Sequence, residues 1–342
     1  MHQSTTAHPW RSAHQQAGRL LLAALLGAAA CSASAAEVPK PSDGFPTRAI
    51  TLISPFPPGG GNDNTSRLLA NELGKVIGQS VVVENRGGAG GNVGVSTASR
   101  ATPDGYTIVM SQNSVMAINP RIYSNPGFDP IEDFIPVSQI TSSPLALVVR
   151  SDAPYKTLED YLSAAQKQPG HVSYATPGSG TLSHLSGTIL AKQRKIDLLH
   201  VPYRGAGPAI NDLMGGQVNM LITSAPSVQA LVQDGSLRVL AITNDKGLGV
   251  FKDVPTTASM GLPELTIDDW YGVFAPKGTP PERVAYLNAA IREALRDPEA
   301  VKKLNGNGAH VVASETEEFA KVVAKEVEYW KDIVRDAGVQ VQ

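Results

Sequence analysis

The sequence predicts an α/β fold of two lobes, each a mostly parallel sheet flanked by helices. Apolar strands alternate with amphipathic helices, which is the pattern of parallel sheets. This pattern starts a second time after residue 143. The chain has 342 residues, 42% of them hydrophobic, which is enough for two cores rather than one.

The order of the expected elements assigns residues 37–142 and 266–342 to lobe 1 and residues 143–265 to lobe 2. The chain then crosses between the lobes near residues 141–143 and 266–270. A cleft between two such lobes is where ligands of this architecture bind.

In the first part of the chain we expect strands at 49–55, 80–84 and 106–110, and helices at 64–77 and 93–100. Leu69, Leu73 and Ile77 recur at helical spacing, and Gly78 ends that helix. Residues 119–136 are rich in proline and asparagine and are expected to be irregular.

Further strands are expected at 137–140, 145–149, 172–175, 198–201, 220–222, 239–243 and 270–275. Helices are expected at 158–166, 182–192 and 208–214, near 225, and at 281–295, 298–304 and 316–337. In the last helix, Phe319, Val323, Trp330 and Val334 recur along one side, at the spacing of a face that packs on a core.

The first 36 residues predict a signal peptide. Arg11 and Arg19 precede an apolar run at 20–30, which is too short to span a bilayer. Small residues before Ala36 allow cleavage by a signal peptidase. A lipoprotein is the alternative, because residues 28–31 loosely fit a lipobox in which Cys31 is acylated. Cys31 is the single cysteine, so cleavage near Ala36 leaves no disulfide and no thiol chemistry.

Without the signal peptide the formal net charge changes from −2 to −4, because that segment contains two arginines and no acidic residue. A mildly acidic chain argues against a nucleic-acid partner held by a basic face.

Three glycine-rich turns connect a strand to a helix. They lie at residues 56–63, 85–92 and 176–181. Glycine lets backbone N–H groups approach a ligand, and the first N–H groups of a helix carry the positive end of its dipole. Each turn is therefore a candidate anion site, although an ordinary connection in an α/β domain has the same pattern.

Nucleotide-binding motifs are incomplete. Gly88 and Gly90 begin a G-x-G-x-x-G pattern, but Val93 occupies its last position. The helix after the first turn lacks the Gly-Lys-Ser/Thr of a phosphate loop.

Catalysis has one weak candidate, a hydrolase that uses Ser179 or Ser183 with His184. Ser183 and His184 are adjacent, so their side chains diverge on a helix, and no G-x-S-x-G motif is present. The histidines after the leader are scattered without metal-ligand spacing, so neither a metal nor another cofactor is expected.

The remaining possibility is an anion-binding site made mostly of neutral groups. Asp63, Arg86 and Arg204 are the charged candidates; each has an alternative structural role, a helix cap for Asp63 and a salt bridge or exposed side chain for the arginines. Neutral donors are expected at strand ends and turns: Ser111, Thr176, Ser179, Thr181 and Ser224. Tyr203 is expected to wall the pocket, and Trp270 either to do so or to belong to the core.

Several motifs together resemble one known family. They are Pro55-Phe56-Pro57-Pro58-Gly59-Gly60 with Asp63, Asn85-Arg86-Gly87-Gly88-Ala89-Gly90-Gly91-Asn92, Pro202-Tyr203-Arg204-Gly205 and Trp270-Tyr271-Gly272. The chain is similar, over about residues 45–338, to the solute receptors of tripartite tricarboxylate transporters, the Bug (Bordetella uptake gene) family.

The resemblance implies a periplasmic "Venus flytrap" that closes on a small organic carboxylate without catalysis. It implies delivery of this ligand to the membrane permease subunits of a tripartite tricarboxylate transporter, and we expect a monomer. The ligand-binding residues that it implies, together with the strand-end candidates, are Phe56, Pro58, Gly59, Gly60, Gly61, Asp63, Gly88, Ala89, Gly90, Ser111, Thr176, Gly178, Ser179, Gly180, Thr181, His184, Tyr203 and Ser224.

The ligand itself is left open. The turns contain no dedicated basic cluster, which favours a mono- or dicarboxylate or an amino acid over a triacid. The chain departs from the family pattern at Asn62, Asn64 and Thr176-Pro177-Gly178, all beside the expected pocket. A receptor that serves signalling instead of transport has the same sequence features.

Overall fold

The computed structural model describes residues 1–2, 38–244, 249–306 and 308–337. The chain divides into two units, Met1–Pro39 and Lys40–Gln342, and the second contains the fold and the site. The predicted signal peptide, its cleavage near Ala36 and Cys31 lie outside the described residues, apart from the first two positions of the chain.

The described part of the second unit contains one mixed sheet with the strand order β2-β1-β3-β9-β4-β7-β5-β6, and β8 and β10 also pair with β4. The strands are β1 (Ile50–Ser54), β2 (Val81–Asn85), β3 (Thr107–Gln112), β4 (Phe134–Arg150), β5 (Ser173–Thr176), β6 (Leu199–Pro202), β7 (Met220–Ser224), β8 (Leu237–Ile242), β9 (Asp268–Pro276) and β10 (His310–Val311).

Helices connect these strands and cover the sheet. The α-helices are α2 (Gly61–Ile77), α3 (Asn92–Ser99), α4 (Asn119–Ile122), α5 (Leu158–Lys167), α6 (Leu182–Arg194), α7 (Ala206–Met214), α8 (Ala225–Gln233), α9 (Pro281–Ala294), α10 (Pro298–Gly306) and α11 (Thr316–Ala337). Short helical turns are η1 (Ala89–Gly91), η2 (Ser114–Ile118), η3 (Gly249–Phe251), η4 (Ala258–Met260) and η5 (Pro263–Leu265). The segment expected to be irregular therefore contains α4 and the start of β4.

The sheet has two halves. Strands β2, β1 and β3 pair in parallel in the first half, and β6, β5 and β7 do so in the second. Strands β9 and β4 join the halves and run antiparallel to their neighbours. The predicted α/β fold is confirmed. Each half is mixed rather than mostly parallel, because it includes strands that run antiparallel to their neighbours. Such strands can be joined without a helical crossover.

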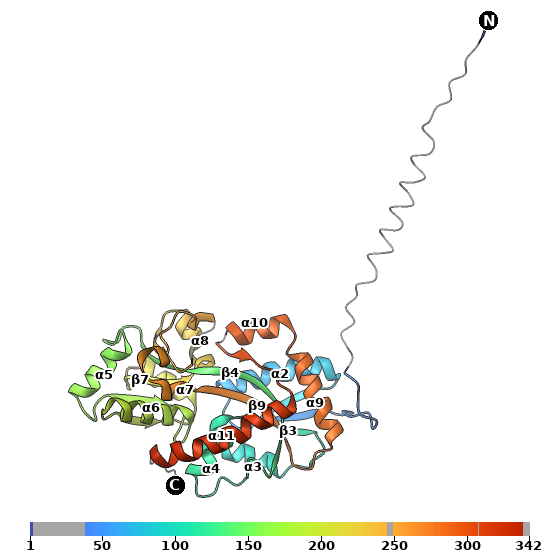
Figure 1. Cartoon of the computed structure of the whole chain (residues 1–342), viewed down its shortest axis with the longest axis horizontal. Coiled ribbons are helices and arrows are strands. Elements are labelled where there is room, and N and C mark those ends of the chain that lie inside the picture. The colour runs from blue at the N-terminus through green and yellow to red at the C-terminus, as the bar shows by residue number, and fades with distance from the viewer. Residues whose placement is uncertain (3–37, 245–248, 307, 338–342) are drawn as a thin grey trace. The chain divides into compact units, whose positions relative to one another are not determined.

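Strand β4 is the longest strand and runs through both halves (Figure 1). It pairs with β9 as far as Pro144 and with β7 from Leu145 onward. Two separate strands were expected here, with a break at residues 141–144. That prediction is wrong because the polar residues stay in the ladder, where Ser143 pairs with Asp269 and donates a hydrogen bond to its carbonyl.

Buried Thr243 ties the crossing segments together. Its backbone N–H and hydroxyl oxygen bond to Leu145, and its carbonyl and hydroxyl bond to Ile267. The two segments expected at the crossing, residues 141–143 and 266–270, therefore lie side by side.

The second half of the sheet has a core on each face. Leu145 and Leu147 of β4 belong to one hydrophobic cluster, and Ala146 and Val148 to another. Alternate side chains of a strand point to opposite faces, so the apolar run predicted at 145–149 is buried on both sides.

Helix α11 packs along both halves (Figure 1). Phe319 near its start packs in the cluster of Phe274 in the first half. Trp330 near its end packs in the cluster of Leu185 in the second half. The assignment of residues 266–342 to lobe 1 therefore stays a prediction, because α11 contributes to both cores.

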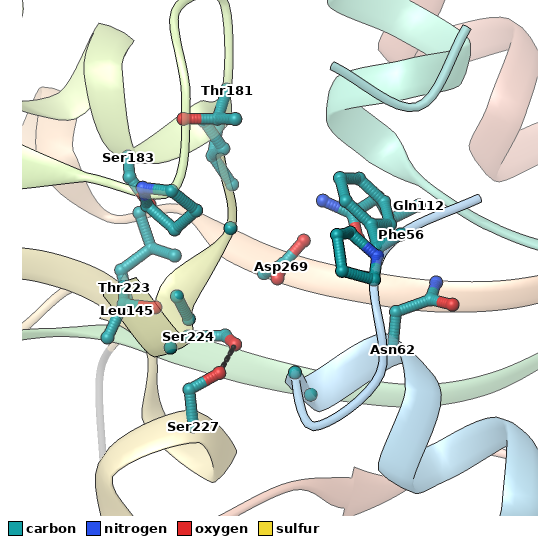
Figure 2. A pocket seen from close by; sticks show the side chains of 18 of the residues that line it. Phe56, Asn62, Gln112, Leu145, Thr181, Ser183, Thr223, Ser224, Ser227 and Asp269 are labelled. Atoms are coloured by element: carbon teal, nitrogen blue, oxygen red, sulfur yellow. Dashed lines mark hydrogen bonds between the residues drawn. The ribbon is translucent and has the colours of Figure 1, made fainter. Parts of the chain in front are cut away.

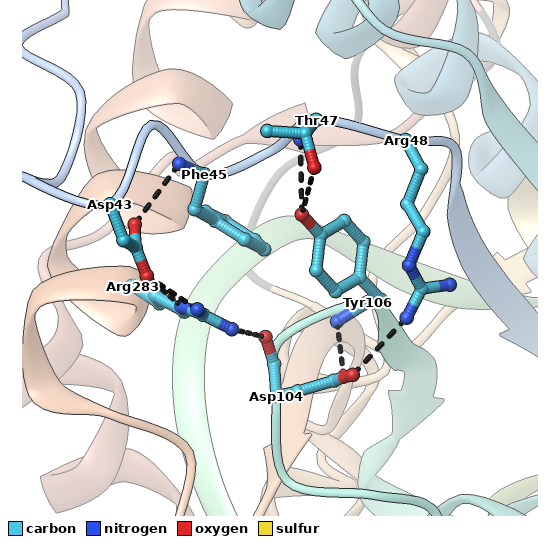
Figure 3. Close-up of polar contacts among 7 residues, drawn as sticks. All are labelled: Asp43, Phe45, Thr47, Arg48, Asp104, Tyr106 and Arg283. Atoms are coloured by element: carbon cyan, nitrogen blue, oxygen red, sulfur yellow. Dashed lines mark hydrogen bonds and ion pairs between the residues drawn. The ribbon is translucent and has the colours of Figure 1, made fainter.

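The segment before β1 is held to the first half by polar contacts (Figure 3). Arg283 of α9 pairs with Asp43 and donates to the carbonyl of Asp104. The guanidinium of Arg48 lies 3.8 Å from the ring centre of Tyr106 and pairs with Asp104. These contacts fix the segment against the first half of the sheet.

Candidate functional site

A pocket lies where the two halves of the sheet meet, and it encloses about 670 Å³ of empty space with its mouth included. Figure 2 shows the side chains of both halves around it: Phe56, Asn62 and Gln112 from the first, Thr181, Ser183, Thr223 and Ser224 from the second, and Asp269 between them. A second hollow continues from it past Phe56, Pro177 and Arg204.

The N-termini of four helices converge on the pocket. The N-cap residues are Gly60 of α2, Thr181 of α6, Gly205 of α7 and Ser224 of α8, and all four line it. The first N–H groups of a helix have no intrahelical acceptor and carry its positive dipole end. The pocket is therefore electrostatically suited to an anion.

Gly61 allows the two halves to approach each other at the pocket. A Cβ at this first residue of α2 would lie 2.6 Å from the hydroxyl oxygen of Tyr271 and 3.0 Å from that of Ser224. The missing side chain thus brings the start of α2 against the second half.

The first glycine turn is held in shape by Asp63. Its carboxylate accepts the N–H of Gly59 at 3.0 Å, the Nδ2 group of Asn85 at 2.8 Å and the guanidinium of Arg67 at 3.0–3.1 Å. Burial opposes its ionisation, but the hydrogen bonds from Arg67, Gly59 and Asn85 outweigh burial and lower the pKa of Asp63. Its side chain is 3% exposed, so Asp63 supports the turn from behind the pocket wall.

The second glycine turn lines the adjoining hollow with Gly88, Ala89 and Gly90. Arg86 pairs with Glu84 and does not line either space, which matches its structural alternative.

The third glycine turn is shaped by hydrogen bonds behind the pocket. The hydroxyl of Thr176 donates to the carbonyl of Gly178 at 3.1 Å and lies 2.8 Å from Nε2 of His200. The N–H of Gly180 donates to Nδ1 of His184 at 3.1 Å. The rings of His184 and His200 stack with their centres 3.9 Å apart.

The burial of His184 and His200 predicts that the protein becomes less stable in acid. Burial lowers the pKa of His184 to about 4; burial and then the charge of His184 lower the pKa of His200 to about 3. An unfolded histidine titrates near pH ~6.5, so below that pH the unfolded chain binds protons that the native chain rejects. We expect the free energy of unfolding to fall as the pH drops from about 6.5 to about 4, with at least about one extra proton taken up on unfolding.

Urea unfolding as a function of pH measures this effect. A His184→Gln/His200→Gln variant should lose much of the slope in this interval, whereas His171→Gln at an exposed histidine should keep it. An unchanged slope in the double variant would contradict the assignment.

The candidate residues divide into two groups. Those that line the pocket or the adjoining hollow are Phe56, Pro58, Gly60, Gly61, Gly88, Ala89, Gly90, Gly178, Ser179, Thr181, Tyr203 and Ser224, and Arg204 joins them. Those that do not line either space are Gly59, Asp63, Ser111, Thr176, Gly180 and His184. Except for Ser111 and His184, the second group belongs to the first and third turns, and His184 of α6 accepts a hydrogen bond from the third turn.

One strand-end candidate, Ser111, was displaced by one residue, and Trp270 takes the core position that was one of its two expected places. Ser111 is fully buried away from the pocket, and its neighbour Gln112 lines it. Trp270 packs in the core, and its neighbours Asp269 and Tyr271 line the pocket. Successive strand side chains face opposite sides, so a displacement of one position exchanges the faces.

Asp269 is the charged pocket residue that the sequence reasoning missed. It is 4% exposed, and burial raises its pKa to about 8. The available signal was an acidic residue directly before the apolar strand expected at 270–275.

The geometry does not support the hydrolase alternative. Nδ1 of His184 accepts a backbone N–H, and the described residues give His184 no hydrogen bond to the hydroxyl of Ser179 or Ser183. Within the described ranges, no three His, Cys, Asp or Glu side chains cluster as metal ligands would. The helices that the structure describes include none with the length and apolarity needed to cross a bilayer.

A two-part α/β sheet with a small-molecule pocket at its junction is the architecture of a solute-binding protein. Residues 65–339 match the family described as the tripartite tricarboxylate transporter family receptor. The chain therefore belongs to this family, as its motifs indicated, and its function is that of a solute-binding receptor.

Solved structures agree with this assignment. The periplasmic binding protein BugD is 33% identical with a TM-score of 0.82, over 87% of this chain and 100% of that one. Rpa4515 of R. palustris with adipate is 32% identical with a TM-score of 0.83, over 86% and 99% of the two chains. MatC of Rhodopseudomonas palustris with bound malate is 32% identical with a TM-score of 0.80, over 85% and 100%.

Proposed function

We propose that this receptor binds a small organic carboxylate in the pocket at the junction and does not transform it. The observation that carries the proposal is the convergence of four helix N-caps, two with hydroxyl side chains, on one pocket. Two relatives hold dicarboxylates, adipate and malate, which supports this ligand class.

The proposed setting is the periplasm, after removal of residues 1–36. The monomeric receptor would then deliver its ligand to the permease subunits of a tripartite tricarboxylate transporter. Family membership supports the transporter as partner. The hydrogen bonding of His184, which among the described residues includes no contact with the hydroxyl of Ser179 or Ser183, supports binding without catalysis.

We further propose that the lobes close about β4, β9 and their junction. Residues 37–142 and 266–342 would form one lobe and 143–265 the other, with hinges at 141–143 and 266–270. The pairing of Ser143 with Asp269 and the bonds of Thr243 place the two crossings side by side, which suits a shared hinge.

The test is thermal and chemical unfolding of the chain from residue 37 onward, with a panel of mono-, di- and tricarboxylates and amino acids. A true ligand at 100 times its Kd adds about 2.7 kcal/mol to the free energy of unfolding. The proposal predicts such a gain for at least one small carboxylate and for no neutral amide of the same skeleton. If no carboxylate stabilises the protein and native mass spectrometry finds no co-purified ligand, the proposal is wrong.

A further inference from the structure

Asp269 is a buried acidic residue in the wall of the pocket. It lies on β9 at the junction, and Figure 2 shows its carboxyl group between the side chains of the two halves. The residue is 4% exposed, and its Oδ1 atom has no hydrogen-bond partner among the described residues. A buried carboxylate is costly without a counter-charge or a full set of hydrogen bonds, so this position favours the neutral acid.

The charges around Asp269 also favour the neutral acid. Those that act on it belong to Asp268 of β9 and Glu326 of α11, and both are acidic. Among the described side chains that line the pocket, those of Asp269, Tyr271 and Arg204 are ionisable, and β4, α2, α6 and α8 add none. Arg204 is exposed and is not among the groups that act on Asp269. Burial raises the pKa of Asp269 to about 8, so the group holds its proton at neutral pH.

A chain of hydroxyl groups connects Asp269 to the second half of the sheet. The hydroxyl of Tyr271 hydrogen-bonds the carboxyl group of Asp269 and donates to Oγ of Ser224 at 3.2 Å. Oγ of Ser224 lies 3.1 Å from Oγ of Ser227, and both serines line the pocket. Each hydroxyl has one proton to donate, so the direction of the first bond sets the direction of the others.

The protonation state of Asp269 sets that first direction. A neutral carboxyl group donates to Tyr271, which then donates to Ser224, and the proton of a serine hydroxyl is left for the pocket. An ionised carboxylate accepts the proton of Tyr271, so the serine hydroxyls donate toward Tyr271 and turn lone pairs to the pocket. The neutral state therefore offers an anion a donor, whereas the ionised state withdraws this donor and adds a negative charge.

We propose that Asp269 is a positioning residue that couples carboxylate binding to its own protonation. The pocket binds a carboxylate when Asp269 carries its proton and rejects it when Asp269 is ionised. The residue acts through the hydroxyl chain and through its charge, so the ligand does not need to reach the buried Oδ1 atom. This inference rests on the proposed function, because it assumes that the pocket binds a carboxylate.

Calorimetric titration at several pH values tests the inference on the chain from residue 37 onward. The probes are L-malate, succinate, adipate, L-lactate and propanoate, and the one that binds most tightly is followed. Its Kd should rise about tenfold between about pH 7 and about pH 9, because Asp269 with its pKa of about 8 loses its proton in this interval.

The native chain provides a second readout that does not depend on the folding of a variant. Binding at about pH 9 should take up close to one proton, because the ligand selects the protonated form of Asp269. Binding at about pH 6 should take up almost none, because the proton is already in place. Titration in two buffers of different ionisation enthalpy measures this number.

Three variants identify the titrating group. Asp269→Asn should make the Kd nearly independent of pH in this interval, because an amide does not ionise. Asp268→Asn should move the midpoint of the rise to lower pH, since the charge of Asp268 raises the pKa of Asp269. Tyr271→Phe should move the midpoint to higher pH, since the hydrogen bond of Tyr271 lowers this pKa.

The outcomes separate this inference from the proposed function. A Kd that changes by less than about threefold over the interval, or binding at about pH 9 without proton uptake, would overturn the role of Asp269 and leave carboxylate binding intact. An undiminished rise in Asp269→Asn would do the same. Failure of every probe to bind at neutral pH would contradict the proposed function, and this inference with it.

Discussion

Gly60→Trp is expected to abolish carboxylate binding while the protein stays folded. Gly60 is the N-cap of α2 with φ −84° and ψ 171°, a conformation open to any residue. A Cβ at this position meets no atom within 4 Å, and the residue lines the pocket. A side chain can therefore begin here without a clash at Cβ, and we expect an indole group to fill ligand space.

We expect the affinity for the best carboxylate of the panel to fall at least about a hundredfold, which is about 2.7 kcal/mol. The free energy of unfolding should change by about 1 kcal/mol or less, the range of N-cap substitutions. Calorimetric titration and urea unfolding measure the two quantities.

Gly60→Ser is the matched control, because serine is a favourable N-cap and is small. It should retain binding within a few-fold. If Gly60→Trp binds as well as the native chain, the ligand does not lie at this pocket.

Asp63→Ala is expected to destabilise the protein by about 1–3 kcal/mol, because it leaves partly buried donors without their acceptor. The substitution removes the partner of the N–H of Gly59 and of the side chain of Asn85. Asn85 also donates to the carbonyl of Phe56, so the turn that walls the pocket loses its support as well. We expect the ligand affinity to fall more than a lost helix cap of about 1 kcal/mol would explain.

Arg67→Ala is the control for this prediction. It removes the half-exposed ionic partner and leaves the hydrogen bonds to Gly59 and Asn85 in place. It should cost about 1 kcal/mol or less. A loss below 1 kcal/mol in Asp63→Ala, with unchanged affinity, would show that Asp63 does not brace the turn.

The sequence was sufficient to predict the α/β class and to place the three glycine turns at a pocket. Both follow from local patterns, since a strand–turn–helix unit can be recognised within about twenty residues. Parallel strands bring their carboxyl ends to one edge, so the turns after β1 and β2 meet in the first half, and those after β5, β6 and β7 in the second.

The missed features depend on contacts between distant segments. Gln112 and Asp269 face the pocket because of the pairing of β3 and β9, which fixes the face that each side chain takes. The role of Asp63 depends on Asn85, which lies 22 positions further along the chain. Strand β4 is continuous because it pairs with β9 and then with β7. The residues at 141–144 contain no local pattern that would predict this pairing.

A crystal structure of the receptor with the tightest-binding carboxylate of the panel tests the central claim most directly. The account predicts a ligand in contact with both halves of the sheet. Its carboxylate oxygens should lie within hydrogen-bond distance of backbone N–H groups at the starts of α2, α6, α7 or α8, directly or through one water. A ligand outside this pocket, or one whose carboxylate meets no helix N-terminus, would contradict the account.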